Sequence, residues 1–224
     1  MSNPVVLVHG LATSSQRTWV ETAWVDLLQD AGREVVLIDL PGHGGRPGLE
    51  DPDDYGRLED LVAAELPDGT VDAIGFSAGA RILLRIAAAQ PERFDKLVLA
   101  GIGASATRPD ERDGLADAVE QTTTDPVADP IARHFVALAE SSGSDIDAVL
   151  HIMRRPGISL SDVDLSDVSA DVLVVLGDSD PAGPGEPLVE RLPSAKLVML
   201  PGVDHFATPK SMGFIDAGLA HLGC

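Results

Sequence analysis

Six short runs of mostly aliphatic residues constrain the fold of this 224-residue chain more than any other feature of its sequence. Continuous apolar runs of this length, rich in valine, leucine and isoleucine, are typical of parallel strands that are buried on both faces of a sheet. The runs cover residues 5–8, 35–38, 71–74, 97–100, 172–176 and 197–200. We therefore expect a sheet of about six strands, most of them parallel.

Helical patterns lie between these runs. Residues 18–30 place Trp19 and Trp24 on one apolar side of a helix, and Gly32 follows as a stop signal. Further helices are predicted over residues 55–66, 78–90 and 212–221. This alternation predicts an α/β fold, with a doubly wound, mostly parallel sheet and helices on both of its faces.

Residues 102–168 interrupt the alternation, because they contain no convincing strand. Helices are predicted there over residues 111–122, 130–141 and 145–154. A connection of roughly 65 residues is far longer than the usual 2–6, so it is unlikely to lack structure of its own. We expect a small helical cap over the ends of the strands, inserted into a single domain that spans residues 1–224, since no repeat or linker divides the chain.

The composition excludes several classes of partner. The formal net charge is −20, and lysine occurs only at Lys96, Lys196 and Lys210. Such a surface repels phosphate backbones and anionic lipids, so neither nucleic acid nor a membrane is an expected partner. A solubilising acidic coat explains the charge most simply. Adaptation to high salt and steering of a cationic substrate stay open as alternatives.

Cellular context follows from the first residues and from cysteine usage. Residues 1–4 lead directly into an apolar run, without the basic leader and long apolar segment of a secretory signal. Cys224 is the sole cysteine, so no intrachain disulfide can form. These features favour a soluble cytoplasmic protein, while the oligomeric state stays open.

The turn after the third apolar run carries the strongest functional signal. It reads Gly75-Phe76-Ser77-Ala78-Gly79, between a predicted strand and a predicted helix. A serine on so tight a turn adopts a strained backbone and projects its hydroxyl above the sheet, where side chains two residues before and after would collide. The amide of Ala78 then points to the oxygen that becomes negative during acyl transfer. A chain with 22 glycines can match this pattern by chance. Whether Ser77 is a nucleophile therefore depends on whether a base and an acid for it occur elsewhere in the sequence.

A serine nucleophile needs an imidazole base held by a carboxylate. His205 lies in the loop after the last apolar run, and Asp180 lies in the loop after the run before it. Asp178 is the alternative carboxylate, although an aspartate directly after a strand often bonds its own loop. Asp204 is adjacent to His205 and cannot easily align its ring. We therefore predict Ser77, Asp180 and His205, in that chain order.

The loop after the first run should supply the second oxyanion donor, for which Leu11 is the candidate. His9 and His43 are expected to order their loops rather than to act as bases. The three remaining histidines fall in predicted helices, where helix surface is the simplest role: His134, His151 and His221.

Together these elements resemble the α/β-hydrolase superfamily, and in particular its small, cap-bearing serine hydrolases. The matching segments, in the order of that superfamily, are residues 9–10, 39–44, 75–79, 177–180 and 204–206. The resemblance implies Ser77 as nucleophile, Asp180 as acid, His205 as base, and Leu11 and Ala78 as oxyanion donors. Two departures are notable: only four residues precede the first run, which implies a sheet truncated at that edge, and the first loop lacks the glycine-rich form of many lipases.

Ester hydrolysis through an acyl-enzyme on Ser77 is the leading functional hypothesis. A thioesterase or a hydrolase of carbon–carbon bonds would use the same residues. Relatives with an aspartate nucleophile are disfavoured by the serine at position 77. A ligand-binding protein that retains the scaffold is the hypothesis from another class, and a perhydrolase activity is a further side reaction.

The pocket for a small-molecule substrate is predicted to be lined by Phe76, Phe135, Met153 and Phe206. No metal site is expected, because no histidines and carboxylates share ligand spacing on a helix face and the sole cysteine is terminal. No cofactor is expected either, because the sequence has no glycine-rich phosphate loop.

Overall fold

The computed structural model describes residues 2–108, 113–125, 129–155 and 159–224. These residues form a six-stranded sheet in the order β2-β1-β3-β4-β5-β6, in which every neighbouring pair is parallel. The strands are β1 (Val5–Val8), β2 (Val35–Ile38), β3 (Val71–Phe76), β4 (Phe94–Ala100), β5 (Asp171–Gly177) and β6 (Ala195–Leu200). The prediction of about six strands, most of them parallel, is confirmed. The strand order reverses between β1 and β3, the place where open α/β sheets bind ligands beyond the carboxyl ends of their strands.

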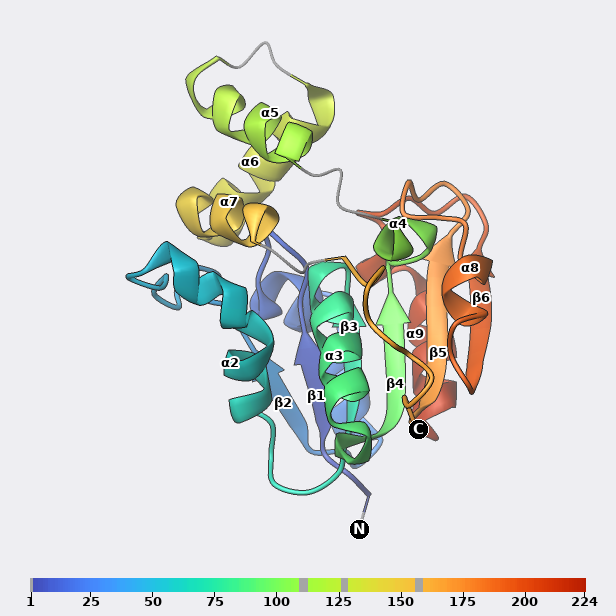
Figure 1. Cartoon of the computed structure of the whole chain (residues 1–224). Helices are drawn as coiled ribbons and strands as arrows, with labels where there is room; N and C mark the ends of the chain where they lie inside the picture. Colours follow the sequence, from blue (N-terminus) through green and yellow to red (C-terminus); the bar gives the residue numbers. More distant parts are fainter. Residues whose placement is uncertain (1, 109–112, 126–128, 156–158) are drawn as a thin grey trace.

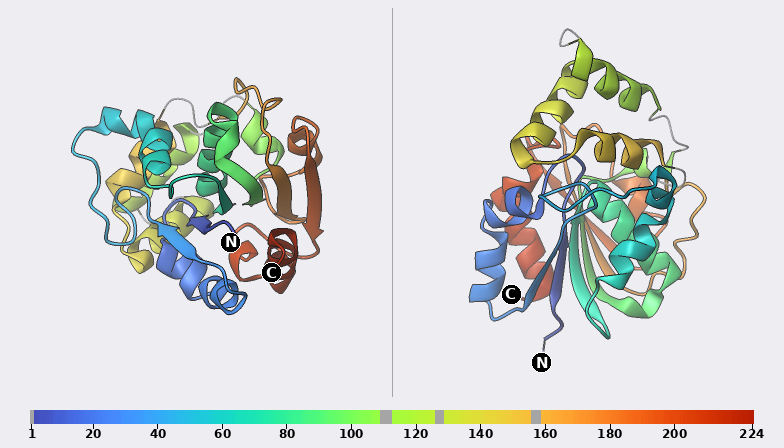
Figure 2. Two further views of the ribbon diagram at one scale, coloured as in Figure 1. Left: turned by 90° about the horizontal axis from the view of Figure 1, so that it is seen from below. Right: turned by 90° about the vertical axis from the view of Figure 1, so that its left-hand side faces the viewer.

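Helices cover both faces of the sheet, as predicted (Figures 1 and 2). On one face α1 (Trp24–Asp30) and α9 (Met212–Leu222) share an apolar cluster with alternate strand residues such as Val5 and Leu7. On the other face α2 (Leu58–Ala64), α3 (Ala78–Ala89) and the short α8 (Glu186–Val189) share a second apolar cluster with the alternate strand residues, such as Val6, Val8 and Val174. The alternation of strand side chains between two cores is the reason that the aliphatic runs are continuous.

The first predicted helix differs from the observed structure. Instead of one helix over residues 18–30, a π-helical turn, η1 (Gln16–Val20), precedes α1. Ala23 separates the two because it adopts a left-handed backbone conformation, with φ +67°. Trp19 and Trp24 are both fully buried and meet edge to face, with ring centroids 6.0 Å apart. Their packing, rather than helical periodicity, sets the apolar spacing in this segment.

Three helices form a cap above the carboxyl ends of the strands (Figure 1). They are α5 (Asp113–Thr124), α6 (Pro130–Ser142) and α7 (Ile146–Arg154), and a short helix, α4 (Ala104–Thr107), precedes them. The predicted start of the first cap helix, residues 111–112, lies outside the described residues. Asp129 caps α6 by accepting hydrogen bonds from the amides of Ile131 and Ala132. Small residues dominate the interior of the cap, which includes Ala116, Val119, Ala132, Ala139 and Val149.

Polar contacts attach the cap to the body of the molecule. Ser142 donates a hydrogen bond to the carbonyl oxygen of Ala12 (3.0 Å), in the loop after β1. At the other end of the cap, the guanidinium of Arg155 makes a bidentate pair with the carboxylate of Glu59 on α2, at 2.8 and 2.6 Å. The cap therefore contacts the same loop that the sequence assigns to the oxyanion hole.

Three short 3-10 helices complete the described part of the fold. They are η2 (Pro52–Arg57) before α2, η3 (Pro91–Arg93) before β4 and η4 (Thr208–Lys210) before α9. Within the described ranges, every helix is too short or too polar to cross a membrane.

Candidate active site

Ser77 lies at the junction of β3 and α3, with φ 53° and ψ −110°. Among the described residues that are not glycine, it shares a positive φ only with Ala12 and Ala23. A Cβ atom on Gly75 would lie 2.6 Å from the Cα atom of Ala80, and one on Gly79 would lie 2.3 Å from the carbonyl oxygen of Val8. The steric reason for both glycines, inferred from the sequence, is confirmed. The turn is strained, and its neighbours leave it no room to relax.

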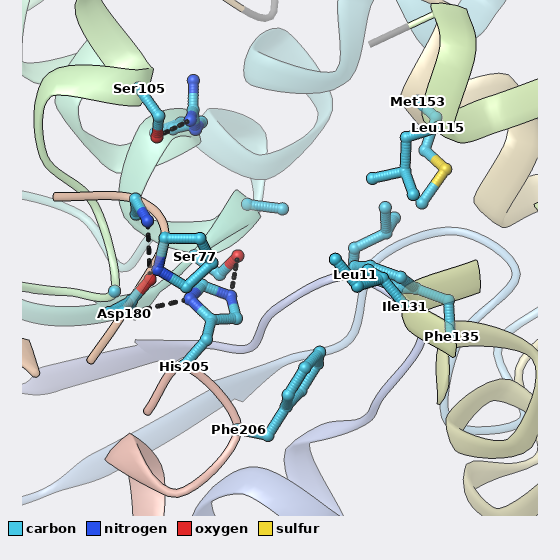
Figure 3. Close-up of a pocket in the computed structure, with 15 residues that line it drawn as sticks. Leu11, Ser77, Ser105, Leu115, Ile131, Phe135, Met153, Asp180, His205 and Phe206 are labelled. Carbon is cyan, nitrogen blue, oxygen red and sulfur yellow. Dashed lines mark hydrogen bonds and ion pairs between the residues drawn. The ribbon is translucent and has the colours of Figure 1, made fainter. Parts of the chain in front are cut away.

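The side chains of Ser77, His205 and Asp180 meet above the carboxyl edge of the sheet (Figure 3). The Nε2 atom of His205 lies 3.0 Å from the Oγ atom of Ser77, and its Nδ1 atom lies 2.8 Å from Oδ2 of Asp180. The other carboxylate oxygen of Asp180 accepts a hydrogen bond from the amide of Ala182 (2.8 Å). The Asp180 side chain is buried, so its charge acts on His205 with little screening by water.

The two rejected carboxylates have other roles. Asp178 accepts a hydrogen bond from the amide of Gly202 (2.8 Å) and thereby ties the loop after β5 to the loop after β6. Asp204 accepts from the amide of Ala207 (2.8 Å) and holds the turn that follows His205. Both aspartates therefore shape the loops that present Asp180 and His205.

The loop after β1 is ordered by two buried histidines. His43 accepts a hydrogen bond from the amide of Ala12 at Nε2 (3.1 Å), and its Nδ1 atom lies 3.0 Å from the carbonyl oxygen of Pro41. His9 likewise accepts from the amide of Leu40 at Nε2 (3.0 Å). The bond to His43 requires an unprotonated Nε2, and burial, together with the neighbouring His9, lowers the pKa of His43 to about 3. Both rings fix loops, as the sequence suggested, and neither contacts Ser77 in a described interaction.

A cavity of about 480 Å³ opens in front of Ser77. Leu11 and Ala78, the two candidate oxyanion donors, line it beside the serine. Of the four predicted pocket residues, Phe135, Met153 and Phe206 line the cavity. Phe76 does not line it: its ring lies behind His205, with centroids 5.0 Å apart, and faces a neighbouring hollow. The reason is the pleat of β3, which turns Phe76 away from the side on which Ser77 emerges.

Several lining residues were missed by sequence reasoning: Arg81, Ser105, Leu115 and Ile131. For Arg81 a signal exists, because it lies four residues after Ser77 at the start of an apolar helix and thus on the same helical face. The other three come from the cap segment. Their position depends on how that segment packs, for which the sequence offers no local pattern.

Two histidines of the cap were expected on helix surfaces. The ring of His134, on α6, contacts the Phe206 ring at a tilt of 46°, with centroids 3.8 Å apart, and the ring of His151, on α7, stacks on Tyr55 at 5.5 Å. Across the described parts of the chain, no group of three or more histidine, cysteine or acidic side chains is arranged to hold a metal ion.

The fold and this site define the class: an α/β-hydrolase scaffold with a serine, a histidine and an aspartate at the carboxyl edge of its sheet. The sequence matches the model of the alpha/beta hydrolase family over residues 5–212, and the chain belongs to this family. Among curated proteins it is similar to the pimeloyl-[acyl-carrier protein] methyl ester esterase of Nitrosomonas europaea, at 27% identity over 90% of this chain and 88% of that protein. It is also similar to the protein of the same name from Neisseria meningitidis serogroup B, at 28% identity over 76% and 75%.

Solved structures share the fold. An esterase from Exiguobacterium antarcticum superposes with a TM-score of 0.76 at 20% identity and covers 100% of this chain and 92% of that one. A bromoperoxidase from Bacillus anthracis superposes with a TM-score of 0.72 at 24% identity, covering 100% and 93%. The family and the curated relatives together support hydrolase chemistry on esters.

Proposed function

We propose that this protein is a serine hydrolase that cleaves carboxylic esters of small molecules through an acyl-enzyme on Ser77. One observation carries the proposal: the Oγ atom of Ser77 lies 3.0 Å from Nε2 of His205, whose Nδ1 atom lies 2.8 Å from the buried Asp180 carboxylate. These distances suit proton transfer along hydrogen bonds, and the order of groups is the one that activates a hydroxyl at neutral pH.

In the first step His205 takes the proton of Ser77 as the Oγ atom attacks the ester carbonyl carbon. The carbonyl oxygen becomes negative and is stabilised by the amides of Leu11 and Ala78, the second of which begins α3. His205 then gives the proton to the departing alcohol, and the acyl group remains on Ser77. Asp180 holds the ring in the tautomer with hydrogen on Nδ1 and stabilises its positive charge.

In the second step water enters and His205 removes one of its protons. The resulting hydroxide attacks the acyl carbon, the same amides stabilise the oxyanion, and the Ser77–acyl bond breaks with return of the proton to Oγ. No metal or cofactor takes part in this proposal. The strained backbone of Ser77 contributes by keeping Oγ aimed into the cavity in both steps.

Two observations favour esters over other bonds that the same three residues cleave. The curated relatives are named methyl ester esterases, and the cavity is lined mainly by apolar side chains that suit an alkyl or acyl chain. Thioesters and carbon–carbon bonds of diketone-like substrates are the alternatives. Comparing kcat/KM for matched short esters, thioesters and diketones ranks the three, and faster turnover of either alternative would contradict the ester assignment.

The direct test is covalent labelling with a fluorophosphonate, followed by peptide mass spectrometry. We expect one adduct, on Ser77, and we expect Ser77→Ala to lose both the adduct and about 10³-fold or more of the activity on p-nitrophenyl butyrate. Ser141→Ala, an exposed serine of α6, is the matched control and should keep both. An unlabelled Ser77 would favour a ligand-binding protein on a hydrolase scaffold.

A further inference from the structure

The cavity wall contains one polar pair besides the three candidate catalytic residues. Arg81 on α3 and Ser105 on α4 both line the cavity, and Nη2 of Arg81 donates a hydrogen bond to Oγ of Ser105 (3.2 Å). Arg81 is only 8% exposed. The remaining described residues of the wall are apolar or glycine, so this pair forms a distinct polar corner.

The polar corner and the apolar wall lie on different sides of Ser77. In Figure 3 Ser105 lies to one side of Ser77, while Leu11, Leu115, Ile131, Phe135 and Met153 lie to the other. A scissile carbonyl held at Ser77 therefore has an apolar arm of the cavity on one side and a polar corner on the other. This asymmetry predicts a substrate with two chemically different ends.

The polar corner has the chemistry of a carboxylate site. Because Ser105 accepts from Arg81, its own hydroxyl hydrogen is available to point elsewhere. Ser105 is also held in place, since its amide donates to the carbonyl oxygen of Ala182 (3.0 Å), in the loop that carries Asp180. A guanidinium next to a fixed hydroxyl donor is a favourable arrangement for a planar anion.

The net charge of −20 disfavours the binding of an anion, but it acts at longer range than Arg81 does. Charges on the surface are screened over about 8 Å at physiological salt, whereas Arg81 would act on a bound carboxylate at contact distance. The surface therefore slows the approach of an anion without cancelling its binding. We expect added salt to raise kcat/KM for an anionic substrate.

We propose that Arg81 and Ser105 bind a carboxylate of the substrate, so that the preferred substrates are esters with an alkyl chain on one side of the scissile bond and a short carboxylate-bearing chain on the other. This inference rests on the proposed ester hydrolase function and adds a substrate class to it. Such a substrate can carry its carboxylate on either side of the ester bond. A monoalkyl ester of a short dicarboxylic acid carries it on the acyl side, and an acyl ester of a short hydroxycarboxylic acid carries it on the alcohol side.

The test compares matched substrates. Monohexyl succinate and 4-hexanoyloxybutanoate carry the carboxylate, and hexyl 4-oxopentanoate replaces it with a neutral methyl ketone of similar size. We expect at least one of the two carboxylates to exceed the ketone in kcat/KM by about tenfold or more, the effect of one charge-assisted contact. Equal or higher kcat/KM for the ketone would overturn the proposal, as would a preference for the cationic ester hexanoylcholine.

Variants assign the preference to the polar corner. In Arg81→Met the ratio of kcat/KM for carboxylate over ketone should fall to about one, and in Arg81→Lys it should be intermediate because the charge remains but the planar fork is lost. Ser105→Ala should lower the ratio by a smaller factor. Arg17→Met, which removes an exposed cation of a neighbouring hollow, is the control and should keep the parent ratio. A ratio is independent of how much active enzyme each variant yields.

Binding without turnover separates this inference from the proposed function. Calorimetry with Ser77→Ala should detect monohexyl succinate binding that is weakened about tenfold or more by adding Arg81→Met, and Arg81→Lys serves if that double variant does not fold. If the parent protein hydrolyses no ester but this binding is found, the hydrolase proposal fails and the carboxylate site stands. If the parent protein hydrolyses the ketone ester without preferring carboxylates, the hydrolase proposal stands and the carboxylate site fails.

Discussion

The edge of the sheet and the cap above it are built in different ways. At the edge, Ser77 occupies a strained turn enclosed by the backbone of β1 and α3, and His43 ties the adjoining loop through hydrogen bonds in a buried setting. The cap is held together by an interior of mainly small side chains, and it meets the body through a few polar contacts such as Arg155 with Glu59. Steric enclosure leaves the first region one geometry. The side chains of the cap can change without disturbing the sheet.

This contrast assigns different tasks to the two regions. The chemistry proposed for Ser77, Asp180 and His205 depends on distances near 3 Å, which only rigid elements maintain. Substrate choice depends on the shape and charge of the cavity, to which the cap contributes Leu115, Ile131, Phe135 and Met153. Arg81 belongs to the rigid region, so a charge preference should survive changes in the cap.

The largest effect is expected from the carboxylate of the edge. Asp180→Asn should lower kcat by about 10³–10⁴-fold with little change in the folded structure, because the amide no longer selects the Nδ1–H tautomer of His205. Steady-state assays with p-nitrophenyl butyrate measure this loss of kcat. Asp178→Asn is the matched control and should cost about tenfold at most, since Asp178 contacts only loop groups in its described interactions. Equal losses in both variants would break the assignment of Asp180.

The next effect compares a glycine of each region. Gly79→Ala should destabilise the protein by about 3 kcal/mol or more, because its Cβ atom would collide with the backbone of Val8 and His9. Gly114→Ala, on α5 of the cap, should stabilise it by about 0.5–1 kcal/mol, since nothing lies within 4 Å of the new Cβ atom. Urea unfolding of both variants measures the difference, and similar values would contradict the contrast between the regions.

The buried His43 predicts a pH dependence that belongs to the edge. Its folded pKa is about 3 against an unfolded value of 6.5, so the unfolded state binds more protons between these values. Stability from this residue is present above pH 6.5 and is lost as the pH falls toward 3. In His43→Gln the slope of unfolding free energy against pH, measured from pH 4 to 6, should decrease by up to about 1.4 kcal/mol per pH unit. An unchanged slope would show that His43 is not the group responsible.

The smallest effect tests the contact between the two regions. Ser142→Ala removes the hydrogen bond to the carbonyl oxygen of Ala12 and should cost about 1 kcal/mol of stability, with a few-fold rise in KM. The control is Ser141→Ala, at the exposed neighbouring serine, which should change both the stability and KM by less. If Ser142→Ala lowered activity as strongly as Asp180→Asn, the cap would have to count as part of the catalytic edge.

Much of the edge could be predicted from the sequence because its signals are local. The aliphatic runs, the glycines around Ser77, and the loops that carry Asp180 and His205 each lie within a few residues, and strand order brings their ends together. The choice of Asp180 over Asp178 agrees with the hydrogen bonds of each. The helix predicted over residues 18–30 failed because the left-handed Ala23 has no signal in its residue type.

The tertiary structure decided much of the cavity wall, although Phe135, Met153 and Phe206 were predicted to line it and do. Phe76 was expected there and faces a different hollow, whereas Ser105, Leu115 and Ile131 were not expected and line it. Periodicity and turn chemistry are properties of neighbouring residues, so the sequence by itself determined the sheet, the strained serine and the order of its partners. A cavity is formed by residues that are distant in the chain, so the meeting of Arg81 with Ser105, and the apolar arm opposite, depend on how the cap segment packs over the sheet.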